Sequence, residues 1–459
     1  MSLTTVAEDL ERLRTTYRTG RTKTYEWRIG QLEALSRMMD EQETRFADAL
    51  AGDMHRGHTE SITTDLAVVR GDLKDAIKHL KKWMKPENVK MPLVLGTGAK
   101  CEVIREPLGV ALIIGAWNYP IMLTLGPLIG AIAGGNCAVI KPSELPKACA
   151  VAVERSVKEY LDPDAFAVVQ GGIPETTEIL AQRYDYIFFT GSPPVGRIVM
   201  EAATKHLTPL TLELGGKSPA IVAADADLEV AAKRIVQGKF LNAGQTCIGV
   251  DYVMVEEAVA DDLIDRLKNE IVAFYGTNPK TSQDLARIIN DANFDRLVGL
   301  IGDNEVAIGG DHDREERYIG PTMLVDVPPD AEVMSEEIFG PIMPVVRVGS
   351  IPEAIEHVVE GEKPLALYVF SKDKKLQRQV MARTSSGGAC INDTLTHIAI
   401  PEAPFGGVGY SGMGQYHGKY GFDTFTHAKT VLTRTTKLDP DLRYPPYEGM
   451  KATLAEKMM

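Results

Sequence analysis

The stretch GVALIIGAWNYPIMLTLGPLIGAIAGGNCAVI, residues 109–140, runs for 32 residues without a charged side chain. An apolar run of this length would be long enough to cross a membrane. Three turn-forming groups, at residues 118–120, 126–127 and 134–136, divide it into an apolar strand, a short helix at about 123–133 and a second apolar strand. Continuous apolar strands are typical of a parallel sheet buried on both faces, so we predict a β-α-β unit and no membrane span.

The alternation of apolar strands and helices continues along the chain after this stretch. The strand-like segments CAVIKPS, FAVVQGG, YIFFTG and LTLELGG are separated by the helical patterns CAVAVERSVKEYL, TTEILAQR and VGRIVMEAATKH. This rhythm predicts an α/β fold with a Rossmann-like, doubly wound parallel sheet that carries helices on both faces. Such sheets bind ligands at the carboxyl ends of their strands, so we expect cofactor contacts in AWNYP, KPSE and TGSPPVG.

Four parts of the chain are predicted. Residues 1–86 and 106–213 form the first domain, which opens with a helix that carries Val6, Leu10, Leu13 and Tyr17 at helical spacing. After a predicted hinge at 214–217, a second α/β domain occupies residues 214–418. The strand-prone runs 89–105 and about 424–436, within the parts 87–105 and 419–440, are predicted to pair into a small β element at an oligomer interface, and 441–459 to form a polar tail.

Composition excludes several classes of protein. The chain has 459 residues, 44% of them hydrophobic, and a formal net charge of −13, which fits a soluble globular protein and disfavours nucleic acid as a partner. Its five cysteines are widely spread, with no CxxC pair and no Cys/His cluster at zinc spacing. We therefore predict no metal site and a reducing, cytoplasmic location.

Two polar residues lie where chemistry is plausible. Cys247, in FLNAGQTCIGVDYV (240–253), is either an inert buried thiol or a reactive one, whose pKa the start of a helix would lower. Glu213 ends the apolar strand LTLE, where a carboxylate is costly unless it is paired or functional. It is therefore either a general base with a raised pKa or half of a salt bridge at a domain junction.

Two glycine-rich segments could bind phosphate. Residues 191–196, GSPPVG, lie between the strand YIFF and a helix, where backbone N–H groups and the helix dipole could hold a phosphate, or where the chain merely turns. Residues 407–412, GVGYSG, match GxGxxG but follow no apolar strand, which disfavours a dinucleotide-binding role.

Seven motifs, in order over nearly the whole chain, resemble those of the aldehyde dehydrogenase superfamily. They are WNYP (117–120), KPSE (141–144), FTGS (189–192), LELGGKSP (212–219), GQTC (244–247), EEIFGP (336–341) and PFGGVGYSGMG (404–414). The short N-terminus, KPLALYVFS, YHGKYGFDTFTHAK and LRYPPY resemble the class 3 branch, which implies hydrophobic or aromatic aldehydes and a homodimer. In this family the GVGYSG segment belongs to the catalytic half of the chain.

The resemblance implies roles for the catalytic residues. Cys247 would attack the aldehyde carbon, Asn118 and the Cys247 backbone N–H would stabilise the oxyanion, and Glu213 would act as the base. Tyr119 would line the substrate site. A CoA-acylating or acyl-reducing relative has no need of a base at position 213, and a non-catalytic relative has no need to keep all three catalytic groups, so NAD(P)-dependent aldehyde oxidation is preferred.

The resemblance also implies the cofactor contacts and names the first domain as the NAD-binding one. Lys141 and Glu144 would bind the adenosine ribose, which favours NAD while NADP is tolerated. The turn 191–196 would bind the pyrophosphate, although Pro193-Pro194 departs from the family pattern there and stiffens it. The complete set of predicted cofactor contacts is Trp117, Lys141, Glu144, Gly191, Ser192, Gly196, Leu214, Glu337 and Phe339.

Overall fold

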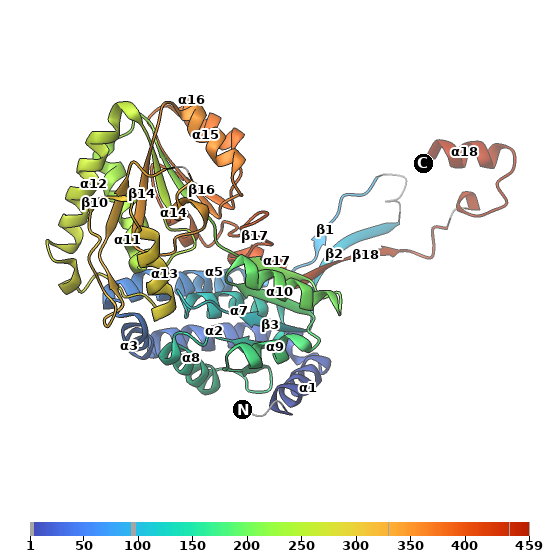
Figure 1. Ribbon diagram of the computed structural model, residues 1–459. Helices are drawn as coiled ribbons and strands as arrows, with labels where there is room; N and C mark the ends of the chain where they lie inside the picture. The colour runs from blue at the N-terminus through green and yellow to red at the C-terminus, as the bar shows by residue number, and fades with distance from the viewer. Residues whose placement is uncertain (1–3, 93–97, 329, 440, 459) are drawn as a thin grey trace.

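The computed structural model describes residues 4–92, 98–328, 330–439 and 441–458. Figure 1 shows two α/β lobes stacked on each other and a β arm that projects from the lower lobe and ends in the C-terminal helix α18 (Met450–Met458). Each lobe is built on its own sheet. The chain is therefore α/β, as predicted.

The lower lobe contains a six-stranded sheet in the order β17-β7-β6-β3-β4-β5. All strands are parallel except the short β17, which the chain contributes from a much later position. Winding starts at β3, proceeds through β4 to β5, and then returns to β6 and β7 on the other side, so β3 and β6 flank the topological switch point. The strands are β3 (Val110–Ile114), β4 (Cys137–Lys141), β5 (Phe166–Val168), β6 (Tyr186–Thr190), β7 (Leu210–Glu213) and β17 (Gly412–Met413).

Helices cover both faces of this sheet. The 109–140 stretch forms β3, α7 and β4, as predicted, and α7 is buried along its whole length because it is apolar on every side. It packs against α2, α5 and α17. The helices of this lobe are α1 (Thr4–Arg18), α2 (Tyr25–Glu41), α3 (Glu43–Met54), α4 (His58–Glu60), α5 (Ala67–Trp83), α7 (Met122–Gly134), α8 (Lys147–Tyr160), α9 (Ile173–Ala181), α10 (Pro193–Thr204) and α17 (Gly418–Thr424).

The upper lobe contains a seven-stranded sheet in the order β10-β13-β14-β9-β8-β15-β16. Only β10 is antiparallel to its neighbour. The strands are β8 (Pro219–Val222), β9 (Tyr252–Glu256), β10 (Glu305–Ile308), β13 (Thr322–Val325), β14 (Ile342–Val348), β15 (Ala366–Phe370) and β16 (Gly388–Ile391). Its helices are α11 (Leu228–Phe240), α12 (Ala260–Tyr275), α13 (Asp291–Ile301), α14 (Glu332–Ser335), α15 (Ile351–Glu360) and α16 (Lys374–Arg383), and a small hairpin joins β11 (His312–Asp313) to β12 (Tyr318–Ile319).

The arm is a three-stranded antiparallel sheet of β1 (Glu87–Asn88), β2 (Ala99–Pro107) and β18 (Thr426–Arg434). The predicted pairing of the two strand-prone segments is confirmed. Residues 93–97 of the first segment lie outside the described residues. β18 is an edge strand of this sheet.

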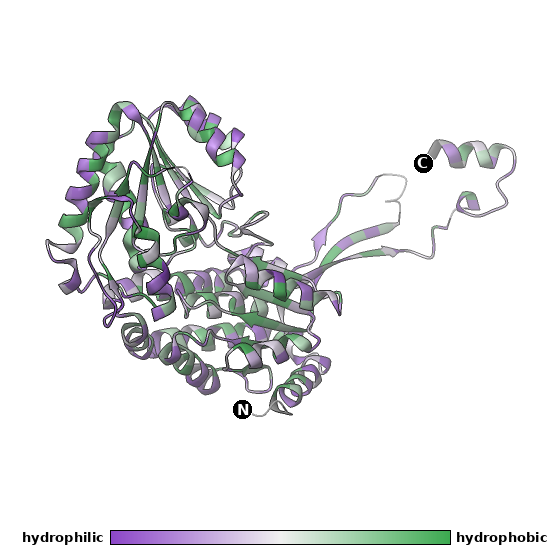
Figure 2. Cartoon of the chain, in the orientation of Figure 1, coloured by the Kyte–Doolittle hydropathy of each residue, from purple (hydrophilic) through white to green (hydrophobic). Residues whose placement is uncertain are grey.

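Hydropathy follows the layers of the two lobes. Figure 2 shows apolar residues concentrated on the central strands and polar residues on the outward sides of the helices. Among the helices that the structure describes, none is long and apolar enough to cross a membrane. The prediction that residues 109–140 form a buried β-α-β unit is confirmed.

Candidate active site at the junction of the two lobes

Cys247 lies in a loop of the upper lobe, after α11 and the 3₁₀ turn η3 (Leu241–Gly244). Asn242 and Ala243 in this turn have φ of 52° and 51°, and Gly244 has φ of 74°. Left-handed backbone is unfavourable for residues other than glycine, so the loop must be held by its surroundings. The prediction that Cys247 begins a helix is wrong, because the left-handed residues end the helical run and the thiol follows in a turn.

The electrostatic surroundings of Cys247 also differ from the expectation. Burial, followed by the charges of Glu337 and Glu213, raises the pKa of the Cys247 thiol to about 12, while the backbone N–H groups of Ile248 and Cys247 oppose this shift. The predicted lowering of the pKa is therefore wrong, because no helix N-terminus is present and two carboxylates are near. The two carboxylates belong to β7 of the lower lobe and to the EEIFGP motif of the upper lobe.

Glu213 is the last residue of β7 and only 3% of it is exposed. Burial raises the pKa of its carboxyl group well above the usual range. Both carboxylate oxygens are buried without a hydrogen-bond partner among the residues that the structure describes. The salt-bridge alternative for Glu213 is therefore wrong, and the raised pKa predicted for a base is confirmed.

The glycine-rich loop 404–414 lies beside Glu213. Gly412 pairs with Glu213 across β17 and β7, and the backbone N–H of Leu214 donates to the carbonyl of Ser411 at 3.1 Å. A Cβ built on Gly406 would lie 3.1 Å from Oε1 of Glu213. The GVGYSG segment therefore borders the buried carboxylate and does not connect a strand to a helix, in agreement with the rejection of its GxGxxG pattern.

Asn118 and Tyr119 follow β3 and contact the loop that carries Cys247. The Asn118 Nδ2 group donates to the carbonyl of Gln245 at 3.1 Å, and the Tyr119 hydroxyl lies 2.8 Å from Oγ1 of Thr246. Both residues are buried. The predicted oxyanion amide is therefore hydrogen-bonded, across the junction of the lobes, to the residue two positions before Cys247 in the sequence, and Tyr119 contacts the same loop.

The predicted adenosine contacts lie at the carboxyl end of β4. Lys141 is buried and its Nζ donates to Oε2 of Glu144 at 2.8 Å and to the Pro142 carbonyl at 3.2 Å. Partial burial alone would raise the pKa of Glu144, but the hydrogen bond and charge of Lys141 lower it. The result is an ionised carboxylate at the surface, 43% exposed and held by a buried cation.

The predicted pyrophosphate turn follows β6, beside the topological switch point. The Gly191 N–H donates to the carbonyl of Glu213 at 3.0 Å, and Ser192 is the extended N-cap residue of α10. A Cβ built on Gly196 would lie 2.9 Å from Cδ2 of Leu214, so glycine allows the helix to approach Leu214 closely. Gly191, Ser192, Gly196 and Leu214 thus lie close together at the ends of β6 and β7.

The start of α10 is poorer in hydrogen-bond donors than the sequence suggested. Pro193 and Pro194 occupy the first helical positions, where proline is favourable because its fixed φ suits the helix. Neither has an N–H group, so of the first three helical residues only Val195 can donate. The expected row of backbone donors at this turn is therefore reduced, although the helix dipole is unaffected.

The predicted nicotinamide contacts come from both lobes. The rings of Trp117 and Phe339 meet edge to face with centroids 5.2 Å apart. A Cβ built on Gly215 would lie 2.0 Å from Oε2 of Glu337, so the Glu337 carboxylate would have to shift to admit a larger residue there. Burial, followed by the charge of Asp251, raises the pKa of Glu337 to about 8, against the hydrogen bond from Gly216.

The donor set fits a dinucleotide. Predicted contacts follow β3, β4 and β6, which are neighbours in the sheet, so they meet along one edge at the switch point. From this edge the predicted cofactor contacts continue through Gly196 and Leu214 to the rings of Trp117 and Phe339, which meet where the two lobes join. A carboxylate able to accept from a ribose hydroxyl, a helix N-terminus and an aromatic pair are groups that suit the parts of an extended dinucleotide.

Some residues that hold this site were not found from the sequence. Arg56 contacts the Asn118 and Asn242 segments, and Lys217 with Asp251 holds the segment that carries Glu337. Arg56 lies in the sequence between His55 and His58, which are both exposed, whereas Arg56 is buried. A long-range polar contact leaves no periodic signal in a sequence, although Lys217 did belong to a quoted motif, LELGGKSP.

Comparisons with known proteins agree with this geometry. The family model for the aldehyde dehydrogenase family matches residues 5–431. Aldehyde dehydrogenase family 3 member B1 of Rattus norvegicus is 48% identical over 442 residues, covering 96% of this chain and 94% of the relative. A relative from Canis lupus familiaris, "Aldehyde dehydrogenase, dimeric NADP-preferring", is 46% identical over 444 residues, covering 96% and 98%.

A solved structure supports the same assignment. The structure described as "Substrate bound state of Staphylococcus Aureus AldH" matches with a TM-score of 0.96 at 43% sequence identity and covers 99% of both chains. The match extends over both lobes, as the seven motifs do. The resemblance seen in the sequence is confirmed, including its class 3 branch, and the chain belongs to the aldehyde dehydrogenase family.

Proposed function

We propose that this aldehyde dehydrogenase oxidises medium-chain aliphatic or aromatic aldehydes to carboxylic acids through an acyl intermediate on Cys247. The observation that carries the proposal is the convergence at this thiol. Asn118 is hydrogen-bonded to the Cys247 loop, and the charges of Glu213 and Glu337 act on the sulfur. An amide, a thiol and a buried carboxylate are the groups that aldehyde oxidation with hydrolysis requires.

In the first stage Glu213, acting through water, takes the proton of the Cys247 thiol, whose raised pKa keeps it protonated until then, and the sulfur forms a bond to the aldehyde carbon. Glu213 releases this proton to solvent before the second stage. The carbonyl oxygen becomes an oxyanion, which the Asn118 amide and the Cys247 backbone N–H stabilise. Nδ2 of Asn118 has a second hydrogen beyond the one given to Gln245. Each well-aimed donor contributes about 3–4 kcal/mol to transition-state stabilisation.

The second stage converts the tetrahedral adduct to the acid. Bound NAD or NADP supplies the hydride acceptor, so the carbon bound to Cys247 reaches the oxidation level of a thioester. Glu213 then takes a proton from water, the hydroxide oxygen bonds to the acyl carbon, and the carbon–sulfur bond breaks. The carboxylic acid leaves and the Cys247 sulfur is restored.

The presence of Glu213 favours hydrolysis of the acyl intermediate over its transfer to coenzyme A. Transfer to a thiol needs no base that activates water, whereas hydrolysis does. A buried, unpaired carboxylate is costly to keep, so its presence beside the Cys247 loop favours water as the acyl acceptor.

NAD is the preferred cofactor in this proposal, and NADP is accepted. The ionised Glu144 carboxylate, held by Lys141, accepts a hydrogen bond from a ribose 2′-hydroxyl and repels a 2′-phosphate. The name of the Canis lupus familiaris relative describes it as NADP-preferring, so the preference is modest. A kcat/KM ratio for NAD over NADP above one supports it, and a ratio below one contradicts it.

We further infer a cytoplasmic homodimer. All five cysteines are free, which suits a reducing compartment. The arm presents an edge strand that needs cover, and the Canis lupus familiaris relative is described as dimeric.

The variant Cys247→Ala tests the central assignment. Aldehyde oxidation should fall to background, because no other side chain replaces the sulfur, while NAD binding, measured by quenching of cofactor fluorescence, should persist. The matched variant Cys390→Ala, at a thiol that pairs with His397 at 3.2 Å, should retain turnover. Wild-type turnover in Cys247→Ala would refute the assignment.

A panel of aldehydes tests the substrate class. Values of kcat/KM from acetaldehyde through hexanal and decanal to benzaldehyde and cinnamaldehyde should rise with chain length or aromaticity. Equal values across the panel would contradict a site shaped for apolar aldehydes.

A further inference from the structure

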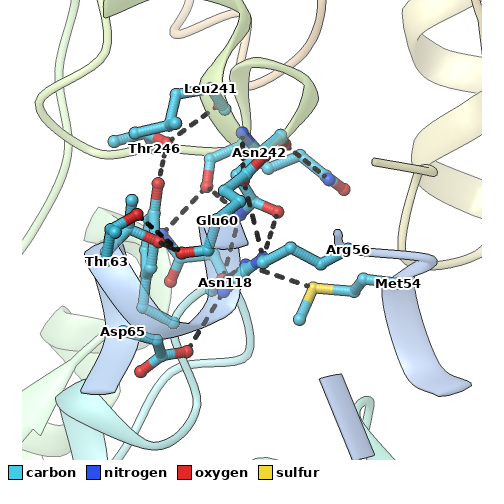
Figure 3. A network of polar contacts seen from close by, with 12 residues as sticks. Met54, Arg56, Glu60, Thr63, Asp65, Asn118, Leu241, Asn242 and Thr246 are labelled. Carbon is cyan, nitrogen blue, oxygen red and sulfur yellow. Dashed lines mark hydrogen bonds and ion pairs between the residues drawn. The ribbon is translucent and has the colours of Figure 1, made fainter. Parts of the chain in front are cut away.

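Arg56 is a buried cation at the junction of the two lobes. It lies between α3 and α4, and only 1% of the residue is exposed. Its guanidinium lies over the Tyr119 ring, 4.7 Å from the centroid, and one nitrogen, Nη1, forms an ion pair with Oδ2 of Asp65 at 3.1 Å. Figure 3 shows this guanidinium at the centre of a polar network drawn from three separate parts of the chain.

The first set of contacts reaches the Asn118 segment. Nη2 of Arg56 donates to the backbone carbonyl of Asn118, which also accepts from Nδ2 of Asn242 at 2.9 Å. Asp65, the ion-pair partner, accepts from the backbone N–H of Met122 at 2.5 Å. Two points of the chain that follows β3 are therefore bound to Arg56, one directly and one through Asp65.

The second set of contacts reaches the loop before Cys247. Nε of Arg56 donates to Oδ1 of Asn242 at 3.2 Å. Glu60, whose carboxylate lies 3.8 Å from the guanidinium, accepts from the backbone N–H of Asn242 at 2.8 Å. These bonds lie at the left-handed residues of this loop, where the backbone cannot keep its shape unaided.

The two segments are also joined to each other at the same point. Nδ2 of Asn118 and Nδ2 of Asn242 both donate to the carbonyl of Gln245 at 3.1 Å. The side chain of Gln245 donates to the carbonyls of Asn242 and Arg287 and accepts from the N–H of Ile289. Gln245 is thus fixed. The position of Asn118 relative to Cys247 therefore depends on the hydrogen bonds from the Arg56 guanidinium to the Asn118 carbonyl and to the Asn242 side-chain amide.

We propose that Arg56 is a positioning residue that holds the Asn118 segment and the Asn242–Cys247 loop in one geometry, so that the two oxyanion donors point at the same substrate oxygen. The fork of the guanidinium suits this task, because its planar donors reach both segments and Asp65 at once. The inference rests on the proposed roles of Asn118 and Cys247. It predicts a defect confined to steps that form an oxyanion.

Two variants of Arg56 test the proposal against a control arginine. Arg56→Met keeps the length of the side chain without its donors, and Arg56→Lys keeps the charge without the fork. Arg28→Met removes another buried guanidinium, which donates to the carbonyls of Thr22 and Ala133 far from Cys247. It controls for loss of stability alone.

Three measurements are compared for each variant: kcat for aldehyde oxidation, Kd for NAD, and the rate of Cys247 alkylation by iodoacetamide, a reaction that forms no oxyanion. Arg56→Met should lose about 10²-fold in kcat, the effect of one misplaced oxyanion donor, with Kd and alkylation within twofold of wild type. Arg56→Lys should recover part of the loss. Arg28→Met should melt earlier with kcat unchanged.

The outcomes separate the two hypotheses. If Arg56→Met has wild-type kcat, the positioning role is wrong and the proposed function stands. The positioning role is also wrong if kcat, NAD affinity and the alkylation rate all fall by the same factor, because that pattern indicates general disorder of the site. If Arg56→Met does not fold, Arg56→Lys decides in the same way. A wild-type protein that oxidises no aldehyde overturns the proposed function and this inference with it.

Discussion

Glu213 affects both the stability of the protein and its proposed reaction. Its carboxyl group is buried at the end of β7, and neither oxygen has a hydrogen-bond partner within the described part of the chain. Because burial penalises the charged form, the pKa is raised well above the usual range and the group holds a proton at pH values where an exposed glutamate has lost it. A base with this pKa is strong, but it must first be deprotonated.

Replacement of Glu213 should therefore change stability and activity in opposite directions. The folded-state pKa lies above the unfolded-state pKa, so the wild-type protein loses stability as the pH rises through the window between them. Glu213→Gln lacks this titration, and its advantage over wild type should grow by at most about 1.4 kcal/mol per pH unit within that window. Thermal melts of both proteins from pH 5 to pH 9 measure the difference.

The same Glu213→Gln variant should hydrolyse its acyl intermediate at least about 10²-fold more slowly, because general base catalysis is lost. Steady-state rates and the burst of NADH in rapid mixing measure this. Glu229→Gln, at an exposed carboxylate 3.7 Å from Nζ of Lys233, is the control and should match wild type. A parallel pH dependence of stability in Glu213→Gln and wild type would show that Glu213 titrates normally.

The structure brings together the three catalytic residues proposed from the sequence, whereas the pKa expected for one of them, Cys247, is wrong. Cys247, Glu213 and Asn118 could be found because motifs preserve residue types in order. The pKa of Cys247 could not, because it depends on carboxylates that come from β7 and from the 336–341 segment. Electrostatics is a property of the assembled site, and no window of sequence around Cys247 contains both charges.

At the scale of elements, the segment that carries Glu337 and Phe339 is irregular. The ion pair of Lys217 and Asp251, called the latch below, holds it in place. The Lys217 Nζ donates to Oδ2 of Asp251 at 2.6 Å and to the carbonyls of Val333 and Glu336 at 3.0 and 2.9 Å. Oδ1 of Asp251 accepts from the N–H of Ile338 at 2.9 Å. Two charged side chains thus bind both ends of the segment.

Asp251→Asn should loosen this segment. The charge that holds Lys217 is lost, which should cost about 1.5–3 kcal/mol of stability, the contribution of a hydrogen bond to a charged group. If displacement of the Glu337 segment weakens cofactor binding by ~1.4 kcal/mol, KM for NAD rises about tenfold. Denaturant melts and initial rates at varied NAD measure the two effects.

A matched control for the latch is Glu159→Gln, which removes a surface carboxylate paired with Arg45 at 2.8 Å. Surface pairs contribute about 0–1 kcal/mol, so both readings should stay near wild type. An Asp251→Asn protein that is destabilised but keeps the wild-type KM for NAD would show that the Glu337 segment does not depend on the latch.

The elements themselves were predictable to different degrees. The apolar strands and α7 followed from residues 109–140, because a strand buried on both faces must be apolar throughout. β17 was not predicted, since two residues that pair with β7 from almost two hundred positions away have no periodicity of their own. The contacts of Arg56 were not predicted for the same reason. Its partners come from the turn before α5, the loop after β3 and the Asn242 loop.

At the scale of the whole molecule, the arm leaves a strand edge without a neighbouring strand among the residues that the structure describes. β18 pairs with β2 on one side only, and Leu432 on it is 57% exposed. The N–H of Thr435 donates to the carbonyl of Gly98 at 2.8 Å. Because backbone groups alternate in direction along an antiparallel strand, Val431 directs its N–H toward β2 and Thr430 directs its N–H outward.

This alternation provides a test of the proposed homodimer. Thr430→Pro removes an outward N–H from each protomer, and two lost hydrogen bonds of about 1 kcal/mol each should raise the dimer Kd about thirtyfold if the edge pairs with a second copy. Val431→Pro instead breaks the ladder with β2 and should disorder the arm, a change visible in proteolysis. Sedimentation equilibrium measures the Kd. If the wild-type protein is a monomer, the proposed dimer is wrong. If Thr430→Pro leaves the dimer Kd unchanged, the dimer interface lies elsewhere, because an edge strand that pairs through its backbone loses a hydrogen bond when proline replaces an outward N–H.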